Sequence, residues 1–413
     1  MGGLEEDVLS EWRGKIKKLV KAHEAETLDL FRHLHQHPER SWQEYETTKL
    51  IKNELTKLGI EILDIGLKTG VAALLEGGKK GPCIALRADI DGVPMIDEEK
   101  SGCDYPSKTP GIVHACGHDT HTATLLGAAK VLAGMKDEIR GSVKFLFQPA
   151  EEVNKGALHM IELKCMENPK VDAVFGLHCS PEVPVGSVAV KSGPLMAAVH
   201  RFYIDVHGKG GHGGIPQRNC DPVIGSAAII QALQTIISRE ASPLQPGVLS
   251  VCSIHGGEGM TWNVTPELVK LAGTCRSYDK ELAEKFEPSM RRILKGVAEG
   301  YNLRADLEYN YDLPVVANPA GMVPIALEAV ESIGAKPVDP IPSTGGEDFT
   351  FFMDHAPGFF YWLGVRNEEK GYINPWHSPF FRADEDCIAV GAGVYAASVF
   401  CAIEAAEKNM LKK

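Results

Sequence analysis

The spacing of apolar residues predicts alternating helices and strands in the first part of the chain. Over residues 4–37 apolar side chains recur every three or four positions, which is typical of one long amphipathic helix or two joined helices, and Pro38 ends it. A second helix is predicted over residues 45–58. Strand-like apolar runs follow at residues 60–65, 71–76 and 83–88, and the last is almost entirely apolar, as in a strand buried on both faces of a sheet.

Side chains that can bind metals follow several of these apolar runs directly. Asp89 and Asp91 follow the run 83–88, Glu151 and Glu152 follow the run 142–147, and His178 ends the run 171–177. Strands that alternate with helices predict a largely parallel sheet, and ligand sites in such sheets gather at the carboxyl ends of the strands. We therefore expect a site at that edge.

The pattern changes near residue 192 and predicts an inserted domain. Residues 199–308 read as strand, glycine-rich loop, helix, strand, strand, helix and strand, with the helices at 221–238 and 282–299. This β-α-β-β-α-β order is the ferredoxin-like split arrangement. Helix and strand alternation returns at 322–333 and 359–363, and a helix over 385–410 closes the chain. We predict one domain from residues 1–195 and 309–413, and a second from residues 196–308.

Composition narrows the class of protein. The 413 residues, 44% of them apolar, provide a large core, and the net charge of -12 argues against binding to nucleic acid or to an anionic membrane. The ten cysteines lack paired spacing, and the N-terminus is not basic and then apolar, so no secretory signal is expected. No window approaches the roughly 18 uninterrupted apolar residues of a membrane span. These observations predict a soluble globular protein of the reducing cytoplasm.

The stretch 113–121 is rich in thiol and imidazole groups, and it precedes a predicted helix over 123–135. Cys116 and His118 are two residues apart and can chelate one divalent ion, although this pair alone is equally compatible with a buried cysteine beside a surface histidine. Further groups strengthen the metal interpretation. The candidates from separate segments are Asp89, Asp91, Cys116, His118, Glu151, Glu152, His178 and His377.

The number and type of these groups favour two ions. One thiolate, three imidazoles and a carboxylate, from Cys116, His118, His178, His377 and Glu152, exceed a closed tetrahedral site and suit two ions that share a bridging ligand. The Cys-x-x-Cys spacing of a structural zinc site is absent. For three further histidines, at positions 33, 35 and 37, favourable placement at a helix C-terminus is a commoner explanation than a metal role.

Six short motifs, spread in order along the chain, resemble one family. The chain resembles the amidohydrolase branch of the aminoacylase and carboxypeptidase-type dinuclear metallopeptidases, which includes hippurate hydrolases, auxin-conjugate (indole-acetyl-amino-acid) hydrolases and N-acetyl-diaminopimelate deacetylases. The resemblance implies an α/β fold, with a zinc-exopeptidase-like three-layer catalytic domain and the inserted ferredoxin-like domain. The motifs are Ala85 to Pro94, His114 to Asp119, Gln148 to Glu152, Gly176 to His178, Gly345 to Phe349 and His377 to Pro379.

The resemblance also implies a role for each residue of the catalytic domain. It implies that Glu151 is the general base and that Asp91 orients a ligand histidine from outside the ligand set. Cys116 stands where the wider superfamily has a bridging aspartate, so a bridging thiolate is the expected role. Glu347 and Asp348 are expected to hold loops near the site. The implied metal ligands are Cys116, His118, Glu152, His178 and His377.

Three further candidate site residues lie in the inserted domain, and only the resemblance indicates them. His212 lies in a glycine-rich loop and is implied to steady an oxyanion, and Asn263 is implied to contact substrate. In the wider superfamily both can reach the active site of a partner subunit. Arg276 is implied to grip a substrate carboxylate, although as a lone arginine it also fits an ordinary surface ion pair. We therefore expect a homodimer or higher homo-oligomer through the inserted domain.

These roles combine into a hypothesis for the reaction. A bridging water, made acidic by the ions, loses a proton to Glu151, the hydroxide attacks an amide carbonyl, and Glu151 passes the proton to the departing amine. An arginine that binds a carboxylate favours N-acyl or N-aroyl amino acids as substrates, cleaved to a carboxylic acid and a free amino acid. The two divalent ions are expected to be Mn²⁺ or Zn²⁺, with Co²⁺ also compatible.

Other functions remain open from the sequence. A dipeptidase or carboxypeptidase of the same superfamily would differ only in whether the acyl group carries an amine. A cysteine hydrolase would use Cys116 as nucleophile and His118 or His178 as base, which leaves Glu152 and His377 without a role. A non-catalytic metal-binding protein would not need Glu151 beside Glu152.

Overall fold

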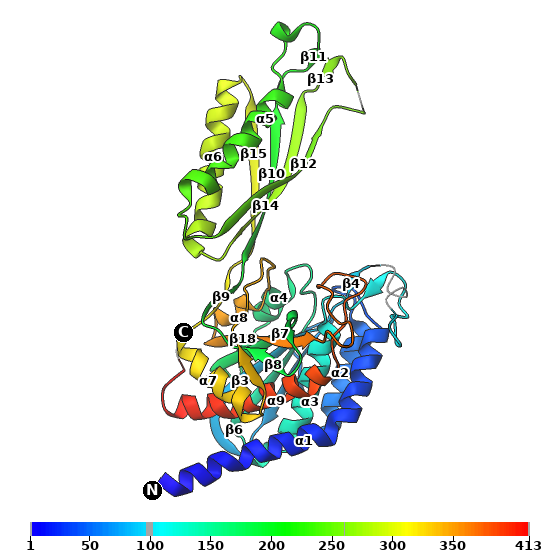
Figure 1. Ribbon diagram of the computed structural model, residues 1–413, viewed down its shortest axis with the longest axis vertical. Helices are drawn as coiled ribbons and strands as arrows, with labels where there is room; N and C mark the ends of the chain where they lie inside the picture. Colours follow the sequence, from blue (N-terminus) through cyan, green and yellow to red (C-terminus); the bar gives the residue numbers. More distant parts are fainter. Residues whose placement is uncertain (1, 96–101, 260, 412–413) are drawn as a thin grey trace. The chain divides into compact units, whose positions relative to one another are not determined.

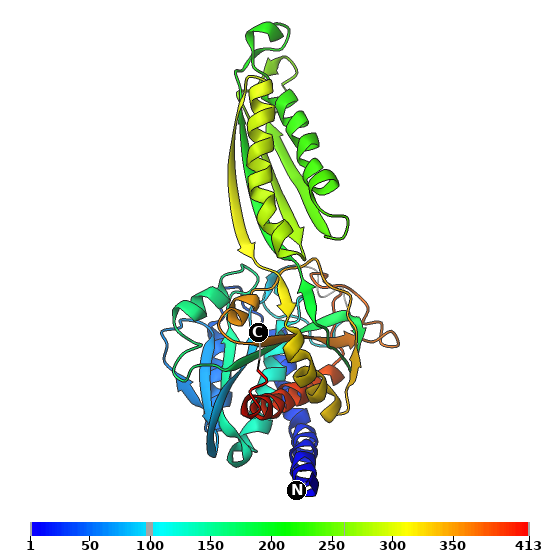
Figure 2. The same ribbon diagram turned by 90° about the vertical axis from the view of Figure 1, so that its left-hand side faces the viewer.

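The computed structural model describes residues 2–95, 102–259 and 261–411, which form two compact units (Figures 1 and 2). The first unit comprises Met1–Gly193, Asn318–Ile341 and Asp348–Lys413, and the second comprises Pro194–Ala317 and Pro342–Glu347. The predicted insertion at 196–308 is thus extended at both ends. It also gains the segment 342–347, which no hydrophobic pattern indicated.

The first unit is built on a mixed eight-stranded sheet. Its four central strands, β6, β3, β7 and β18, are parallel, while β1, β2 and β8 make antiparallel pairs nearer the edges. In sheet order the strands are β1 (Glu61–Leu63), β2 (Val71–Glu76), β6 (Arg140–Gln148), β3 (Lys79–Asp89), β7 (Ala173–Pro184), β18 (Gly358–Arg366), β8 (Ser187–Ala189) and β17 (Lys336–Val338).

Helices cover both faces of this sheet, which gives three layers. Side chains alternate between the two faces along β7: Gly176 lies against Phe349 next to α8, whereas the side chain of the following Leu177 lies against Gly391 of α9. One face carries α1 (Gly2–Gln36), α2 (Tyr45–Lys57), α3 (His118–Ala133), α7 (Val323–Ser332) and α9 (Asp386–Glu407), and the other carries α4 (Gly156–Glu162) and α8 (Thr350–Met353).

The helix α9 is apolar because it is a core helix. The stretch between Asp386 and Glu404 carries no charged side chain, so the helix has the length and composition of a membrane span, contrary to our reading of the sequence. Within the fold, 83% of this apolar window is buried. Trp12 of α1 stacks on Phe400 of α9 with ring centroids 5.2 Å apart, which shows how the two helices share one core.

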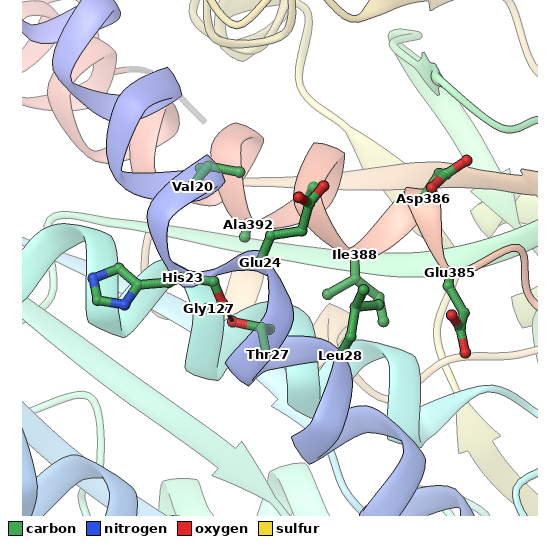
Figure 3. Close-up of a pocket in the computed structure, with 11 residues that line it drawn as sticks. Val20, His23, Glu24, Thr27, Leu28, Gly127, Glu385, Asp386, Ile388 and Ala392 are labelled. Atoms are coloured by element: carbon green, nitrogen blue, oxygen red, sulfur yellow. Dashed lines mark hydrogen bonds between the residues drawn. The ribbon is translucent and has the colours of Figure 1, made fainter. Parts of the chain in front are cut away.

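A small pocket lies among α1, α3 and α9 (Figure 3). Its volume of about 20 Å³ is close to that of one water molecule, and it is lined by residues such as Thr27, Gly127 and Ile388. None of the predicted metal ligands lines it. This pocket is therefore a packing gap between helices and is distinct from the candidate active site.

The second unit is a four-stranded antiparallel sheet with two helices on one face. The order β12-β14-β10-β15 and the helix positions match the ferredoxin-like arrangement. Its elements are β10 (Ala198–His207), α5 (Pro222–Leu233), β12 (Gly247–Gly256), β14 (Leu268–Ser277), α6 (Lys280–Gly300) and β15 (Arg304–Leu313), and β11 (Gly211–His212) pairs with β13 (Val264–Thr265). Two short pairs complete the chain: β4 (Val93–Pro94) with β5 (Ile112–Val113), and β9 (Gly193–Met196) with β16 (Val316–Asn318).

Several element boundaries differ from the sequence prediction. The helix α3 begins at His118, earlier than the predicted 123, because the polar first turn interrupts the apolar pattern that we followed. The strand β7 continues past His178 to Pro184, so this histidine lies within the strand. Arg276 likewise lies within β14, which ends at Ser277, and not just beyond it.

Candidate active site

The candidate site lies where the central parallel strands end. Asp89 closes β3 opposite Gln148 at the end of β6, and His178 of β7 lies opposite Trp362 of β18. The loop that carries Cys116 leads into α3 close by, since the Cys116 sulfur lies 3.4 Å from His178 Nε2. Because the carboxyl ends of parallel strands share one edge of a sheet, groups far apart in the sequence meet here, as predicted.

A glycine allows the loop to approach β7 closely. Gly117 precedes α3 with a φ of 93°, which an L side chain rarely adopts. A Cβ atom at this position would lie 2.2 Å from the Cys179 sulfur. Glycine is therefore required between Cys116 and His118, and this turn brings the two candidate ligands beside β7.

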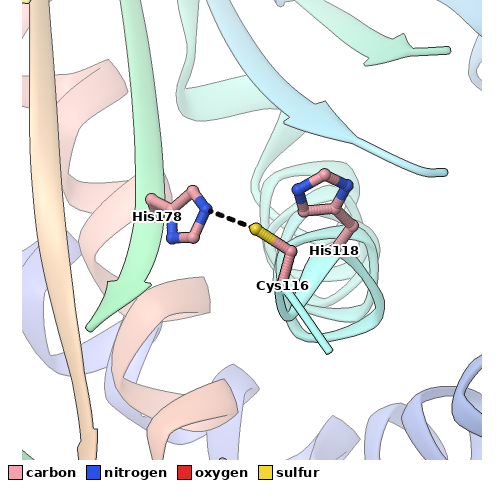
Figure 4. A group of neighbouring side chains, drawn as sticks. All are labelled: Cys116, His118 and His178. Carbon is pink, nitrogen blue, oxygen red and sulfur yellow. Dashed lines mark hydrogen bonds between the residues drawn. The ribbon is translucent and has the colours of Figure 1, made fainter. Parts of the chain in front are cut away.

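The structure brings together all five residues predicted to bind metal. The ligand atoms of Cys116, His118 and His178 all lie within 4.8 Å of one another (Figure 4), and so do those of Cys116, Glu152 and His377. Cys116 belongs to both groups, which is the position that a bridging thiolate requires. His118 also forms such a group with Glu151 and Glu152, so Glu151 lies beside the ligand set.

Hydrogen bonds orient both buried imidazoles for metal binding. His118 Nδ1 lies 3.2 Å from Asp91 Oδ1, and His178 Nδ1 lies 2.8 Å from the carbonyl oxygen of Cys179. Because these oxygens accept, each Nδ1 carries a proton, and whenever the ring is neutral its Nε2 presents a lone pair toward the site. The role predicted for Asp91, orienting a ligand histidine, thus has its geometric basis.

Two atoms of the candidate ligands have no hydrogen-bond partner in the described part of the chain. They are His118 Nε2 and Glu152 Oε1, which are both buried. Burial, followed by the neighbouring His121, also holds the pKa of His178 well below its usual value, so its ring stays neutral. Buried acceptors without donors cost free energy, and a bound cation would satisfy them.

The charge balance of the site also fits cations. Burial opposes protonation of His118, but the nearby carboxylates of Asp89 and Asp91 outweigh it and raise the pKa of His118 to about 10. Burial and the carboxylates of Glu152 and Glu151 raise the pKa of the Cys116 thiol well above its usual value. Both shifts indicate an excess of negative charge, and divalent ions would neutralise it and favour the thiolate. The residues present therefore fit a two-metal site.

Two neighbouring residues, His121 and Asp89, are already engaged by other partners. His121 Nε2 accepts the amide proton of Cys179 at 2.8 Å, and its Nδ1 lies 2.5 Å from Asp89 Oδ1. Asp89, kept as a reserve ligand from the sequence, is also paired at 3.0 Å with the buried Arg87. Both residues are therefore held by neighbours of the site, and neither nitrogen of His121 is available to bind an ion.

Two carboxylates hold the turn that carries the adjacent glutamates. The amide of Ala150 donates to Glu44 Oε1 at 2.8 Å, and the amides of Glu151 and Glu152 donate to the two oxygens of Asp91 at 3.2 and 3.1 Å. Ala150 has a φ of 55°, so this turn is strained. Three successive amide bonds to fixed carboxylates thus set where Glu151 and Glu152 point. Sequence reasoning missed Glu44, which lies more than a hundred residues away and outside every motif.

The buried Asp348 connects several segments beneath the site. It accepts hydrogen bonds from Arg87 Nη2 at 3.0 Å, from Gln148 Nε2 at 2.7 Å and from the amide of Ala157 at 3.1 Å. These partners belong to β3, β6 and α4. Asp348 therefore holds loops near the site, as we predicted for it. Glu347, predicted to act in the same way, is buried and belongs to the second unit.

The remaining predicted residues all belong to the second unit. His212 pairs with Val264 in the antiparallel β11–β13 pair, and the amide of Gly213 donates to the carbonyl of Asn263 at 2.8 Å, so His212 and Asn263 are neighbours. Arg276 lies opposite Val199, at the end of β14 where the chain enters this unit. The structure thus places His212 and Asn263 together beside β13, which leads into the start of β14, whereas Arg276 lies near the other end of β14.

Comparison with known proteins identifies the family. Residues 85–400 match the model of peptidase family M20/M25/M40. The chain is 43% identical to N-acetyl-L-cysteine deacetylase of Bacillus subtilis, covering 88% of this chain and 85% of the relative, and 36% identical to the IAA-amino acid hydrolase ILR1-like 5 of Arabidopsis thaliana, covering 88% and 84%. It is also 41% identical to thermostable carboxypeptidase 2 of Saccharolobus solfataricus, covering 92% and 96%.

Solved structures agree with this assignment. A dinuclear metal-binding peptidase from Bacillus subtilis matches with a TM-score of 0.82 and 38% identity, covering 93% of this chain and 99% of the other. A protein described as an aminohydrolase from Staphylococcus aureus matches with a TM-score of 0.88 and 31% identity, covering 97% and 100%. The predicted fold class and the resemblance are both confirmed. The chain belongs to peptidase family M20/M25/M40 and is a metal-dependent hydrolase of amide bonds.

Proposed function

We propose that this protein hydrolyses N-acyl or N-aroyl amino acids to a carboxylic acid and a free amino acid. The observation that carries the proposal is the buried Glu151 carboxylate beside the candidate ligand Glu152. One glutamate can bind metal while its neighbour transfers protons. Relatives named as an N-acetyl-L-cysteine deacetylase and an IAA-amino acid hydrolase support this substrate class.

The metal ligands in this proposal are Cys116, His118, Glu152, His178 and His377. Two divalent ions held there would supply Lewis-acid polarisation of an amide carbonyl and an activated water. Glu151 accepts the proton of that water and then donates it to the nitrogen of the leaving amine, so one carboxylate acts as base and acid in turn. Its low exposure of 7% keeps competing solvent away from this proton.

Replacing Glu151 by glutamine tests this role. Glutamine has nearly the same shape but cannot accept the proton, so we expect kcat to fall by about 10²–10⁴-fold, the usual contribution of a general acid–base group. Metal content, measured by elemental analysis, should remain at the wild-type level, because Glu151 is not in the proposed ligand set. A variant that turns over at the wild-type rate would exclude Glu151 as the general base.

We also propose that Arg276 binds the carboxylate of the substrate. Burial lowers the pKa of this guanidinium, yet within the described residues it makes no hydrogen bond or ion pair. The nearest competing acid, Asp312, is already held by Arg201 at 2.6 and 2.7 Å. A partly buried cation without a partner is suited to an anionic ligand. Hippurate should therefore be hydrolysed much faster than its amide-capped form, and equal rates would refute this role.

A homodimer formed through the second unit is part of the proposal. In β14, Arg276 lies eight positions after Leu268, which follows the β13 strand that pairs with His212, and this corresponds to about 25 Å of strand. One small substrate cannot touch both residues of the same subunit. If His212 steadies the oxyanion and Asn263 contacts the substrate, both come from the partner.

Mixing two inactive variants tests the shared site. His212→Ala and Arg276→Ala should each be nearly inactive alone. In a randomly reassociated dimer, half of the molecules are mixed, and each mixed dimer contains one intact site. About a quarter of wild-type activity should therefore return. If both residues serve the site of their own subunit, mixing restores nothing.

A carboxypeptidase or dipeptidase is the alternative that a comparison favours, because thermostable carboxypeptidase 2 is 41% identical. Such an enzyme would accept a free amino group on the acyl residue, so rates on glycyl-amino acids and on N-acetylglycyl-amino acids distinguish the two. A cysteine hydrolase would keep its activity in a chelator and lose it on alkylation of Cys116. A non-catalytic protein would bind metal without turnover on either substrate series.

The identity of the two ions is the next part of the proposal. Thiolate ligation favours Zn²⁺, whereas imidazole and carboxylate ligands also suit Mn²⁺ or Co²⁺. Reconstitution of metal-free protein with each ion, followed by a rate measurement, decides between them.

We propose a reducing compartment, the cytoplasm, which is supported by the fact that all ten cysteines are free thiols.

A further inference from the structure

A second cluster with reactive chemistry lies outside the ligand set. It consists of Cys103, in the segment before β5, His35, in the last turn of α1, and Asp119, in the first turn of α3. His35 Nδ1 lies 2.5 Å from Asp119 Oδ2, and His35 Nε2 lies 3.8 Å from the Cys103 sulfur. Three segments that are remote in sequence thus place a thiol, an imidazole and a carboxylate in a row.

The imidazole is fixed by its surroundings. His35 and Asp119 are 5% and 2% exposed, and the ring of His35 also packs edge-on against Tyr105, with centroids 5.3 Å apart. The carboxylate accepts a hydrogen bond from Nδ1–H, which directs Nε2 toward the sulfur and stabilises positive charge on the ring. Nucleophile, base and orienting acid in this order are the signature of an activated cysteine. Helix C-terminal placement, our explanation of His35 from the sequence, accounts for none of these contacts.

The electrostatics of Cys103 differ from those of the other cysteines. Burial opposes its ionisation, but the hydrogen bond and charge of His35 outweigh this and lower the pKa of the Cys103 thiol. Other titratable groups that act on this cluster include Arg382, which also lowers the pKa of Cys103, His114, which acts on Asp119 and His35, and Tyr105, which acts on Cys103 and Asp119. By contrast, burial raises the pKa of core cysteines such as Cys165, to about 12.

Access to solvent completes the requirements for reaction. Cys103 is half-buried, whereas six of the ten cysteines are buried. Cys252 is the exposed thiol and has no imidazole partner among the described residues. Reactive cysteines combine a lowered pKa with partial exposure, and Cys103 has both. Cys252 has the exposure alone, which makes it an internal control.

We propose that Cys103 is a modification site at which a nucleophilic thiolate, assisted by His35 and Asp119, exchanges with low-molecular-weight disulfides. The Cys103 thiolate attacks one sulfur of a disulfide R–S–S–R, the S–S bond breaks, and a new S–S bond joins Cys103 to one R–S group. The other sulfur leaves as the thiolate R–S⁻ and takes a proton from solvent. The disulfide is the oxidant, and no further reactant is needed. This site does not depend on the proposed hydrolytic function.

Site-resolved labelling of the full-length, metal-loaded protein tests the proposal. The probe is hydroxyethyl disulfide, which is small and neutral, and mixed disulfides are located and timed by peptide mass spectrometry. Each unit by which the pKa is lowered multiplies the thiolate fraction at pH 6 about tenfold and reduces nucleophilicity about threefold, a net gain of about threefold. Cys103 should therefore react severalfold faster than Cys252 at pH 6, although Cys252 is more exposed, and its pH–rate midpoint should be lower.

Two variants separate activation from exposure. Cys103→Ser should abolish the fast adduct and leave the Cys252 rate unchanged. His35→Gln removes the imidazole, so the Cys103 rate at pH 6 should fall to that of Cys252 or below, while an unchanged Cys252 rate reports an intact second unit. If His35→Gln does not fold, the wild-type pH profiles alone decide. A Cys103 rate and midpoint equal to those of Cys252 in the wild-type protein would overturn the proposal.

Discussion

Replacing Asp91 by asparagine tests whether hydrogen bonds to one carboxylate position the metal ligands. Asp91 Oδ1 accepts from His118 Nδ1 and from the amide of Glu151, and Oδ2 accepts from the amide of Glu152 at 3.1 Å and from the Ser41 hydroxyl at 2.7 Å. Asparagine supplies one oxygen and one NH₂ group, and the NH₂ group cannot accept. Whichever way the side chain is turned, the amide of Glu151 or of Glu152 loses its acceptor.

The expected magnitude follows from these four bonds. A buried N–H group left without an acceptor costs about 1–3 kcal/mol of unfolding free energy. Losing a partner that orients a metal ligand usually lowers metal affinity or activity about 10–100-fold. Glu44→Gln is the matched control, because Oε1 alone accepts from Ala150 and Oε2 has no hydrogen-bond partner among the described residues. Glutamine keeps that acceptor, so we expect a change of less than about threefold.

The assay combines three measurements on the same preparations: metal content at increasing free ion concentration, kcat/KM on an N-acyl amino acid, and Tm. Asp91→Asn should bind metal more weakly and turn over more slowly, with a lower Tm, whereas Glu44→Gln should resemble the wild type in all three. If Asp91→Asn retains wild-type metal affinity and kcat/KM, the carboxylate does not position the ligands. The hydrogen bonds described here would then be a consequence of the turn and not its cause.

Three further outcomes are expected. Gly117→Ala should lose metal binding and at least about 2 kcal/mol of unfolding free energy, because its Cβ would meet the Cys179 sulfur. The control Gly111→Ala is also at positive φ but in open space, so it should lose only about 1–2 kcal/mol. Equal losses in the two variants would contradict the steric argument. Removal of the ions by a chelator should abolish activity. It should also lower the unfolding free energy by about 2.7 kcal/mol compared with protein at a free ion concentration of 100 times Kd. An unchanged Tm would show that the ions do not stabilise the fold. Burial lowers the pKa of His200 to about 4, below the ordinary 6.5, so the unfolded chain binds the proton more readily than the folded chain. The His200 contribution to the unfolding free energy should therefore fall by about 2 kcal/mol between pH 7 and pH 5. In urea melts over a series of pH values, His200→Gln should flatten this dependence.

Periodicity predicted the elements of the fold but not all of their ends. The apolar runs at β2 and β6 and the spacing in α6 are dictated by burial, and burial is what a hydrophobic pattern records. The start of α3 at His118 was missed because its first turn is polar, and its side chains are buried by pairing with other polar groups. A pattern of apolar residues contains no signal for that kind of burial.

In the site, too, some residues could be predicted from the sequence and others could not. Ligand types and their order along the chain predicted which residues gather around Cys116, because coordination chemistry restricts the choice to a few side chains. Glu44 and His35 could not be selected, since each acts through a partner far away in sequence, Ala150 and Asp119 respectively. Only the fold determines which surrounding acid or imidazole contacts which segment.

The supporting acids also explain how this site can combine a fixed ligand set with a general base that changes its protonation state. Asp91 and Glu44 hold the turn through the backbone amides of Ala150, Glu151 and Glu152. A glutamate that also had to fix its own turn would lose a hydrogen bond each time it took up a proton. Because the amide bonds hold the turn, Glu151 can change its protonation state while Glu152 stays in place. Backbone anchoring of this kind is therefore a condition for one carboxylate to serve as both base and acid.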